Sequence, residues 1–166
     1  MKNADLEIDL VEITDDVSLI TDVKKLLTSY GDYMFTELNL IAGKESFYKD
    51  LENFPTIYYQ PPLGTFVLSK IKDVGVGCVG IKKFSYDNCE MKRMFIKPEF
   101  RGRGIGFVLC NWVIQWCRRA SYKKILLDTN IEMKDAIALY QKCGFKEISP
   151  YCINENNHPV FMELEL

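Results

Sequence analysis

The sequence lacks the features of several protein classes. It has one histidine, His158, and its six cysteines form no C-x-x-C pair, so the usual ligand sets for zinc are missing and we expect no metal. No apolar run approaches the roughly 20 residues that a membrane helix needs. The opening stretch MKNADLEIDLVEITDD has no apolar core of the signal-peptide type. We therefore expect no membrane contact and a cytoplasmic location, where the cysteines would remain reduced.

Charge gives no indication of a nucleic-acid partner. The 166 residues carry 21 Lys and Arg against 23 Asp and Glu, a formal net charge of −2. Residues 1–60 hold 5 basic and 12 acidic side chains (5 − 12 = −7), and residues 61–166 hold 16 and 11 (16 − 11 = +5). The two parts are expected to face different partners. The length and the 48% hydrophobic content favour a single domain over residues 1–166 with a substantial core.

Periodicity predicts an antiparallel start to the fold. Alternation from Leu6 to Ile13 predicts an edge strand, and residues 18–30 and 35–54 have the patterns of two helices with polar faces. The stretch YYQPPLG, which ends at Gly64, stops the second helix. TFVLSKI and GVGCVGIKKF are typical of strands joined by a tight turn at Asp73–Val74–Gly75, and the strand EMKRMFI follows after the turn SYDNC.

Later in the chain the pattern alternates between helix and strand. Apolar side chains recur with helical spacing at Val108, Leu109, Trp112 and Trp116. KKILLD is typical of a strand buried on both faces, KDAIALYQKCG predicts a helix capped by Gly144, and FKEISPY and VFMELEL predict closing strands. This order requires at least one right-handed parallel crossover. The predicted fold class is α/β with a mixed sheet, in which an antiparallel meander precedes a βαβαβ unit with one central parallel strand pair.

Three glycines and two arginines form the turn RGRGIG, between the strand EMKRMFI and the helix that follows it. The free N–H groups of a helix's first turn attract anions. Gly102, Gly104 and Gly106 have no Cβ to keep a phosphate away from the backbone. Arg101 and Arg103 add positive charge. The sequence therefore predicts a phosphate-binding turn, with a plain glycine-rich surface turn as the alternative.

Known phosphate loops differ in their spacing. A P-loop needs G-x-x-x-x-G-K-[ST], which is absent from the sequence. The Rossmann fingerprint G-x-G-x-x-G is one residue longer than this turn, although Asp128 lies about where its ribose-binding acid would be. A Rossmann-type nucleotide-binding enzyme therefore stays as an alternative. The R-x-x-G-x-G pyrophosphate loop of acetyl-CoA enzymes is matched by Arg101, Gly104 and Gly106.

These motifs resemble those of the GNAT superfamily of N-acetyltransferases. EMKRMFIKPEFRGRGIG is similar to the strand and pyrophosphate loop of its central motif, and AIALYQKCGF (residues 136–145) is similar to its second motif. PPLGTFVLSK and GVGCVGIKKF match the preceding strands, so the resemblance covers nearly the whole chain and is weakest before Tyr59. It implies a GNAT-like fold and an enzyme that transfers the acetyl group of acetyl-CoA to a primary amine of a small acceptor.

The resemblance also implies which residues bind acetyl-CoA. Many members have an Asn three residues before the alanine of the second motif; here Met133 stands in that place, and Asn130 lies just upstream as a substitute. The pantetheine arm would lie along the strand before the loop. The residues implied for acetyl-CoA binding are Met94, Phe95, Ile96, Arg101, Gly102, Arg103, Gly104, Ile105, Gly106 and Asn130.

Direct acetyl transfer needs a base for the amine and an acid for the departing sulfur. Tyr140, on the second motif's helix, is the acid that the resemblance implies, and a phenol keeps its proton at neutral pH. The alternative for Tyr140 is an aromatic core residue. Glu90 is the candidate base. In an extended strand it would share a face with Lys92, Met94 and Ile96, and an ion pair with Lys92 is its alternative.

The acceptor site is expected to border the acidic part of the chain. Carboxylates such as Asp32 and Glu37 would attract a cation, which predicts a small, positively charged amine. A non-catalytic acyl-CoA-binding regulator is the alternative function. The oligomeric state stays open, with a homodimer among the possibilities. The aromatic rings expected to face an ammonium are those of Tyr30, Tyr33, Tyr58 and Tyr59.

Overall fold

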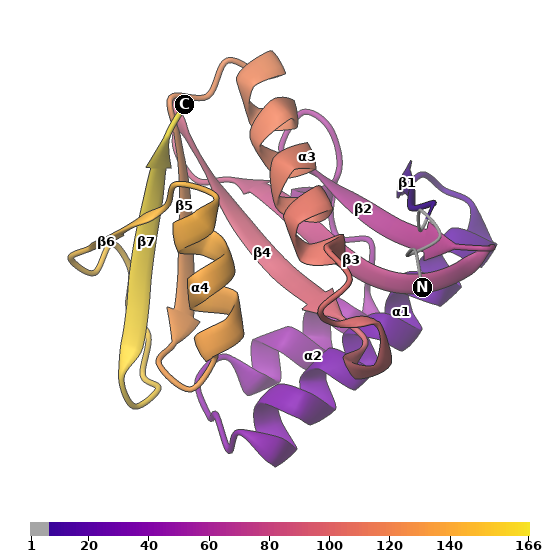
Figure 1. The fold of residues 1–166 in the computed structure, drawn as a ribbon, viewed down its shortest axis with the longest axis horizontal. Coiled ribbons are helices and arrows are strands. Elements are labelled where there is room, and N and C mark those ends of the chain that lie inside the picture. The colour runs from indigo at the N-terminus through magenta and orange to yellow at the C-terminus, as the bar shows by residue number, and fades with distance from the viewer. Residues whose placement is uncertain (1–6) are drawn as a thin grey trace, which may run out of the picture.

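One seven-stranded sheet organises residues 7–166, the part of the chain that the computed structural model describes (Figure 1). The strand order is β1-β2-β3-β4-β5-β7-β6. Only β4 and β5 are parallel within these residues; the other neighbours are antiparallel. This confirms the predicted mixed sheet. The strands are β1 (Asp9–Glu12), β2 (Gly64–Ile71), β3 (Val74–Lys83), β4 (Asn88–Ile96), β5 (Lys124–Asn130), β6 (Lys146–Ile148) and β7 (Pro159–Glu165).

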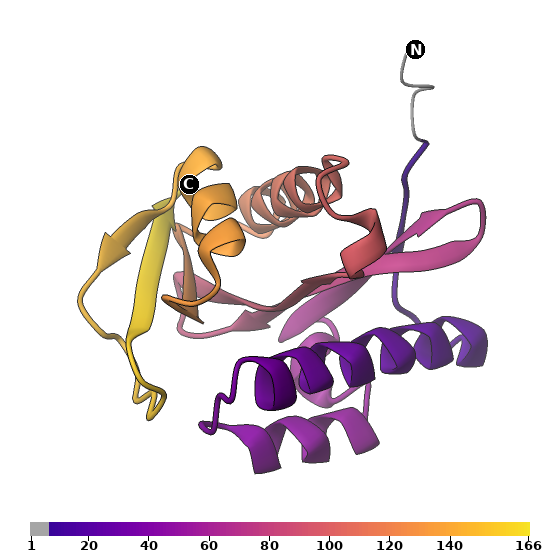
Figure 2. The same cartoon turned by 60° about the horizontal axis from the view of Figure 1, so that its bottom comes forward.

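Within residues 7–166, four α-helices cover the two faces of this sheet. Helices α1 (Val17–Asp32) and α2 (Lys44–Glu52) lie on one face, and α3 (Ile105–Arg119) and α4 (Lys134–Lys142) lie on the other (Figure 2). Each face has its own hydrophobic core, so the sheet is buried from both sides. Within residues 7–166, every helix is too short or too polar to cross a membrane.

The first helices differ from their predicted bounds. Helix α1 begins after Asp16, whose carboxylate accepts hydrogen bonds from two backbone N–H groups of the first turn, and it continues into a short π-helical turn. The helix predicted over residues 35–54 starts only at Lys44. The reason is the backbone of Asn39 (φ 51°) and Gly43 (φ 71°), which is left-handed and interrupts a right-handed helix.

The first strands also differ in detail. The edge strand predicted from Leu6 to Ile13 is observed as Asp9–Glu12, and Leu6 lies outside the described residues. The turn between β2 and β3 is formed by Lys72 and Asp73, both with positive φ (48° and 64°), as in a two-residue type I′ hairpin. The predicted turn at Asp73–Val74–Gly75 is therefore shifted, because Val74 already belongs to β3.

Strand β4 contains a bulge. Arg93 and Met94 together oppose one β3 residue, Val79, and Arg93 has a φ of 59°. An extra residue in one strand reverses the faces to which the following side chains point.

The bulge overturns one prediction about β4. Met94 and Ile96 pack against the core under α3, whereas Phe95 belongs to the core under α1. Glu90 and Lys92 precede the bulge and lie on the same face as Phe95. The expectation that Glu90, Lys92, Met94 and Ile96 share one face is wrong, because it assumed an unbroken extended strand.

Strands β4 and β5 separate soon after they pair. Their register covers only Asn88 to Glu90 of β4, and beyond that point the strands diverge (Figure 1). Within residues 7–166, the β4 edge from Met94 to Ile96 therefore has no β5 partner. The glycine turn follows the fourth strand of a largely antiparallel sheet, which contradicts the Rossmann alternative.

Candidate active site

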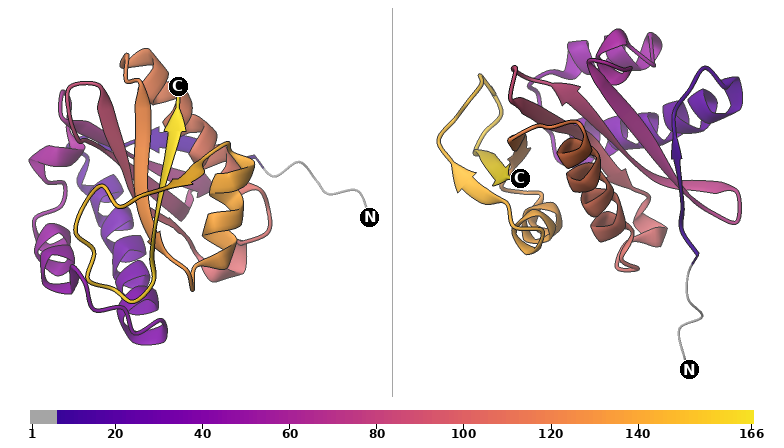
Figure 3. Two further views of the ribbon diagram at one scale, coloured as in Figure 1. Left: turned by 90° about the vertical axis from the view of Figure 1, so that its left-hand side faces the viewer. Right: turned by 90° about the horizontal axis from the view of Figure 1, so that it is seen from above.

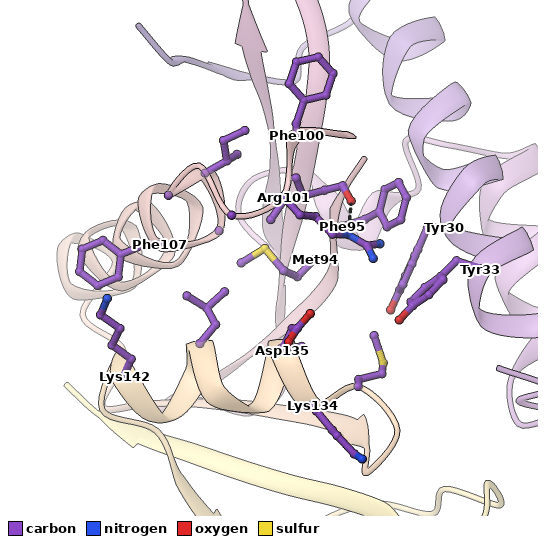
Figure 4. A pocket seen from close by; sticks show the side chains of 18 of the residues that line it. Tyr30, Tyr33, Met94, Phe95, Phe100, Arg101, Phe107, Lys134, Asp135 and Lys142 are labelled. Carbon is purple, nitrogen blue, oxygen red and sulfur yellow. Dashed lines mark hydrogen bonds between the residues drawn. The ribbon is translucent and has the colours of Figure 1, made fainter. Parts of the chain in front are cut away.

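A cavity of about 720 Å³ opens where β4 and β5 separate (Figure 4). We call it the loop cavity, because the RGRGIG turn and the start of α3 form one of its walls. The end of β4, one face of α4, and Tyr30 and Tyr33 form the others. The residues predicted to bind acetyl-CoA that line it are Met94, Phe95, Ile96, Arg101, Gly102, Gly104, Ile105 and Gly106.

The three glycines of the turn serve different purposes. Gly102 (φ 73°) and Gly104 (φ 82°) have backbone conformations that strain any other residue. A Cβ at either position would meet nothing within 4 Å, so the space beside them is open to a ligand. A Cβ at Gly106 would instead lie 2.8 Å from Leu139 of α4. Gly102 and Gly104 therefore shape the turn, and Gly106 allows α3 and α4 to approach.

The start of α3 presents free backbone N–H groups. The first bond inside the helix runs from the Val108 N–H to the Gly104 carbonyl (3.1 Å). The N–H groups of Ile105, Gly106 and Phe107 thus have no acceptor within the helix. Together with the helix dipole they favour a bound anion.

The two arginines of the turn point in different directions. The Arg101 Nε donates a hydrogen bond to the Ile96 carbonyl (3.1 Å). Its guanidinium carbon lies 4.9 Å from the centroid of the Tyr33 ring, and Figure 4 shows the side chain pointing toward the two tyrosines. Arg101 therefore ties the turn back to the end of β4. Arg103 lies over the ring of Phe100 (5.4 Å) and does not line the loop cavity.

Helix α4 contributes residues that the sequence analysis missed. One face of this helix lines the loop cavity, and two lysines on it add positive charge there. Their helical spacing was visible in the sequence, but nothing in it indicated that this face points to the glycine turn. The residues are Lys134, Asp135, Ala136, Leu139 and Lys142.

Asn130 has a structural task away from the loop cavity. It is 3% exposed. Its amide nitrogen donates to the Asn157 carbonyl, and its side-chain oxygen accepts from the Glu132 N–H (3.0 Å). Both ends of the amide are used within the protein, so Asn130 fixes the turn between β5 and α4. Met133, by contrast, lines the loop cavity.

A second cavity of about 690 Å³ adjoins the first. Tyr30, Met94 and Met133 line both, so the two cavities meet at these side chains. Glu90 and Tyr140, the two predicted catalytic residues, both line the second cavity. The structure thus brings the candidate base and the candidate acid to one cavity beside the glycine turn.

Tyr140 is buried, with 6% of its surface exposed. It packs in the core under α3, and its ring centroid lies 5.9 Å from that of Phe145. Burial raises the pKa of the Tyr140 phenol far above its usual value, so the hydroxyl stays protonated at neutral pH. Tyr140 can both pack in the core and donate a proton to a ligand, because it also lines the second cavity.

A polar cluster surrounds Glu90. Lys92 Nζ lies 2.9 Å from Glu90 Oε1 and 2.7 Å from Asp128 Oδ1, so the ion pair considered as the alternative for Glu90 is present. Tyr151 donates its hydroxyl to Glu90 Oε1 (2.7 Å), and Asn154 Nδ2 donates to Asp128 Oδ2 (2.9 Å). Burial lowers the pKa of Lys92, but Asp128 and Glu90 outweigh it and the pKa is raised. Lys92 therefore remains charged.

The carboxylates expected to attract the acceptor lie elsewhere. Asp32 and Glu37 are exposed and line neither cavity. The ring of Tyr58 already carries the Lys82 ammonium (4.5 Å), and Tyr59 is buried in the core under α1. The prediction of a positively charged acceptor thus loses Asp32 and Glu37, while Tyr30 and Tyr33 do line the loop cavity.

A contact between two loops bounds the second cavity. The side-chain oxygen of Asn156, between β6 and β7, accepts hydrogen bonds from the backbone N–H groups of Ile41 (2.9 Å) and Ala42 (2.8 Å). Figure 3 shows the β6–β7 loop in yellow running past the connection between α1 and α2. Asn154 accepts a bond from the Asn156 N–H (3.0 Å). These bonds link the loops to the polar cluster around Asp128.

Metal-binding clusters are absent from the described part of the chain, where no three His, Cys, Asp or Glu side chains converge suitably. The six cysteines are free thiols, and four of them are buried.

Comparisons with known proteins agree with this geometry. A family model described as "Acetyltransferase (GNAT) family" matches residues 26–145. An uncharacterised N-acetyltransferase of Schizosaccharomyces pombe is 30% identical over 168 aligned residues, covering 100% of this chain and 98% of the relative. Among solved structures, an acetyltransferase from Streptococcus agalactiae has a TM-score of 0.77 at 19% identity, covering 96% of this chain and 98% of that one. A GNAT family acetyltransferase from Elizabethkingia anophelis with acetyl-CoA bound has a TM-score of 0.68 at 21% identity, covering 96% and 98%.

Proposed function

Because the chain belongs to the GNAT acetyltransferase family and is an acyltransferase, we propose that it moves the acetyl group of acetyl-CoA directly to a primary amine of a small acceptor. The observation that carries this proposal is the meeting of the two cavities at Tyr30, Met94 and Met133. An acetyl group held in the loop cavity would reach an amine held beside Glu90 and Tyr140, and such positioning is a large part of catalysis.

Three features of the loop cavity support acetyl-CoA as the donor. The free N–H groups at the start of α3 suit a pyrophosphate, and the open space beside Gly102 and Gly104 lets it approach. The unpaired edge of β4 from Met94 to Ile96 offers backbone groups to an amide-containing arm, since they lack a β5 partner within residues 7–166. A GNAT relative of similar fold binds acetyl-CoA.

The proposed chemistry moves two protons. The acceptor nitrogen bonds to the thioester carbonyl carbon, the carbon–sulfur bond breaks, and CoA leaves as a thiol. Glu90, directly or through water, takes the proton that the nitrogen loses, and Tyr140 gives a proton to the sulfur. Backbone N–H groups near Phe95 and Ile96 polarise the carbonyl as negative charge develops on its oxygen.

The single domain over residues 1–166 and the cytoplasmic location remain predictions, and the oligomeric state stays open. The free thiols are in keeping with a reducing compartment.

An acceptor screen tests the proposal. The purified protein is incubated with acetyl-CoA and a panel of primary amines, and free thiol is measured over time. We expect thiol release that requires both the protein and a suitable amine, with product acetylated on nitrogen. A sample without amine corrects for hydrolysis. Tight acetyl-CoA binding without thiol release from any amine would overturn the proposal and favour a non-catalytic acyl-CoA-binding protein.

A further inference from the structure

The buried end of the second cavity has more carboxylate than ammonium. Glu90 and Asp128 share the single ammonium of Lys92, so these three side chains have a formal charge of 1 − 2 = −1. The other carboxylate that lines the cavity, Asp50, is paired with Arg93 (3.3 Å) and leaves no surplus. A protonated amine that enters is therefore attracted to Glu90 and Asp128.

The end of β3 gives the same cavity a surplus of positive charge. Lys82 and Lys83 both border it, but consecutive side chains of a strand point to opposite faces of the sheet. Only Lys82 lies on the face of Glu90, whereas Lys83 pairs with Cys89 of the core under α3. No carboxylate of residues 7–166 lies within 4.0 Å of the Lys82 ammonium. Lys82 is the cross-strand partner of Glu90, yet its ammonium lies over the Tyr58 ring. One cation without a carboxylate partner in residues 7–166, Lys82, thus stands beside the carboxylate-rich end.

Large apolar side chains complete the exposed side of the cavity. Ile153 is 92% exposed, and Tyr58 and Phe84 are about half exposed, yet all three line the cavity. They come from three separate segments of the chain. Exposed apolar side chains that gather around a cavity mark a surface for an apolar part of a ligand.

We infer that the acceptor is an amino carboxylic acid with an apolar side chain. Its amino group faces Glu90 and Asp128, its carboxylate faces Lys82, and its side chain contacts the exposed apolar residues. The inference rests on the proposed function, since it assigns the second cavity to the acceptor. A polyamine fits less well, because it would bring further positive charge to Lys82.

Matched pairs of substrates test the carboxylate. Apolar L-amino acids such as leucine, methionine and phenylalanine are compared with their amides, which keep the amine and the side chain and lose the negative charge. We expect kcat/KM to be on the order of tenfold or more higher for the acids, because a hydrogen bond to a charged group is replaced by a weaker one. The amino group of the amide is less basic than that of the acid, so the amide has the larger fraction of free, reactive amine at a given pH. This difference favours the amide and cannot explain a preference for the acid.

A variant of Lys82 locates the effect in the protein. Lys82→Gln should bring kcat/KM for the acids close to that for the amides, with acetyl-CoA affinity unchanged by calorimetry. Lys146→Gln is the matched control, because Lys146 is exposed on β6 and lines neither cavity. It should keep the wild-type preference.

The outcomes separate this inference from the function on which it rests. Wild-type protein that acetylates the amides as well as the acids overturns the inference and leaves the proposed function in place. A preference for the acids that survives in Lys82→Gln does the same. Failure of every amine to release thiol overturns the proposed function and the inference with it.

Discussion

Two phenols lie near the junction of the cavities, the partly buried Tyr30 and the buried Tyr140, and only Tyr140 is proposed to act as the acid. Burial raises the pKa of Tyr30 to about 12 and that of Tyr140 still further, so both stay protonated at neutral pH. Tyr140→Phe should lower kcat by roughly 10²–10⁴-fold, the usual loss for a general acid, and leave acetyl-CoA affinity unchanged. Tyr30→Phe is the matched comparison. A loss of kcat in Tyr30→Phe alone would move the acid role to Tyr30.

The pH profile gives a second measure of the same acid. A Tyr140 pKa above the ordinary phenol value of about 10 means that kcat should not fall on the alkaline side before about pH 10. Measurement up to about pH 10 is practical because the pKa of Lys92 is raised, so Lys92 stays charged beside Glu90 and Asp128. The stability that Lys92 contributes is present below its unfolded pKa and is lost only as pH rises through the higher folded value. A fall in kcat with an apparent pKa below 9 would exclude Tyr140 as the acid.

Gly104 tests the phosphate-binding turn. In Gly104→Val the side chain would fill open space beside a backbone with φ 82°, where it blocks a pyrophosphate and strains the turn. We expect acetyl-CoA affinity, measured by calorimetry, to fall by about tenfold or more, with the fold retained. Gly43→Val is the matched control, because Gly43 is the left-handed N-cap of α2 (φ 71°) and does not line the loop cavity. Equal loss in both variants would attribute the effect to strain alone.

At the scale of elements, the sequence predicts what depends on local pattern. Hydrophobic spacing identifies α3, α4 and the central strands, and the positive φ of Gly144 (97°) agrees with its predicted place at a helix end. The break before α2 was missed because Leu38, Leu40 and Ile41 continue the apolar pattern of a helix. Their spacing outweighed the turn-forming character of Asn39 and Gly43, although only those two adopt the left-handed backbone there.

The bulge in β4 could not be predicted because its causes are distant in sequence. Arg93 has a positive φ without the glycine or asparagine that usually signals one. Its side chain is held by Asp50 (3.3 Å) and lies 4.5 Å from the Phe47 ring. Both partners belong to α2, more than forty positions earlier in the chain. The candidate site depends on this bulge, since it separates the face of Glu90 from that of Met94.

The contact between the two loops can be tested directly. Asn156→Ala removes two hydrogen bonds that hold the connection between α1 and α2 beside the second cavity. We expect KM for the acceptor to rise by roughly three- to tenfold, since each bond contributes about 0.5–1.5 kcal/mol, while acetyl-CoA affinity stays the same. Asn157→Ala is the control, because Asn157 is exposed and only its backbone carbonyl is used. An unchanged KM would show that the contact does not shape the acceptor site.

For the whole molecule, the distribution of charge along the sequence proved a poor guide to the charge of the cavities. The acidic residues 1–60 and the basic residues 61–166 suggested separate anionic and cationic sites. In the fold, Asp50 from the first part pairs with Arg93 from the second, and the carboxylate surplus near Glu90 arises wholly within the basic part. Charge at a site is set by which strands the topology brings together, and a sum along the chain does not contain that information.

The two cores share one sheet, and this decides how the molecule should unfold. On β2, Phe66 and Leu68 face the core under α1, while Val67 between them faces the core under α3. Neither core can lose its packing without exposing the sheet that supports the other, so we expect one cooperative transition, with near- and far-UV circular dichroism coinciding.

Acetyl-CoA at a hundredfold excess over its Kd should stabilise the folded state by about 2.7 kcal/mol and raise Tm by roughly 5–11 °C. Gly104→Val should unfold in the same single step with a smaller shift. Two separate transitions would contradict the single domain, and a single transition that acetyl-CoA does not move would contradict the proposed cosubstrate.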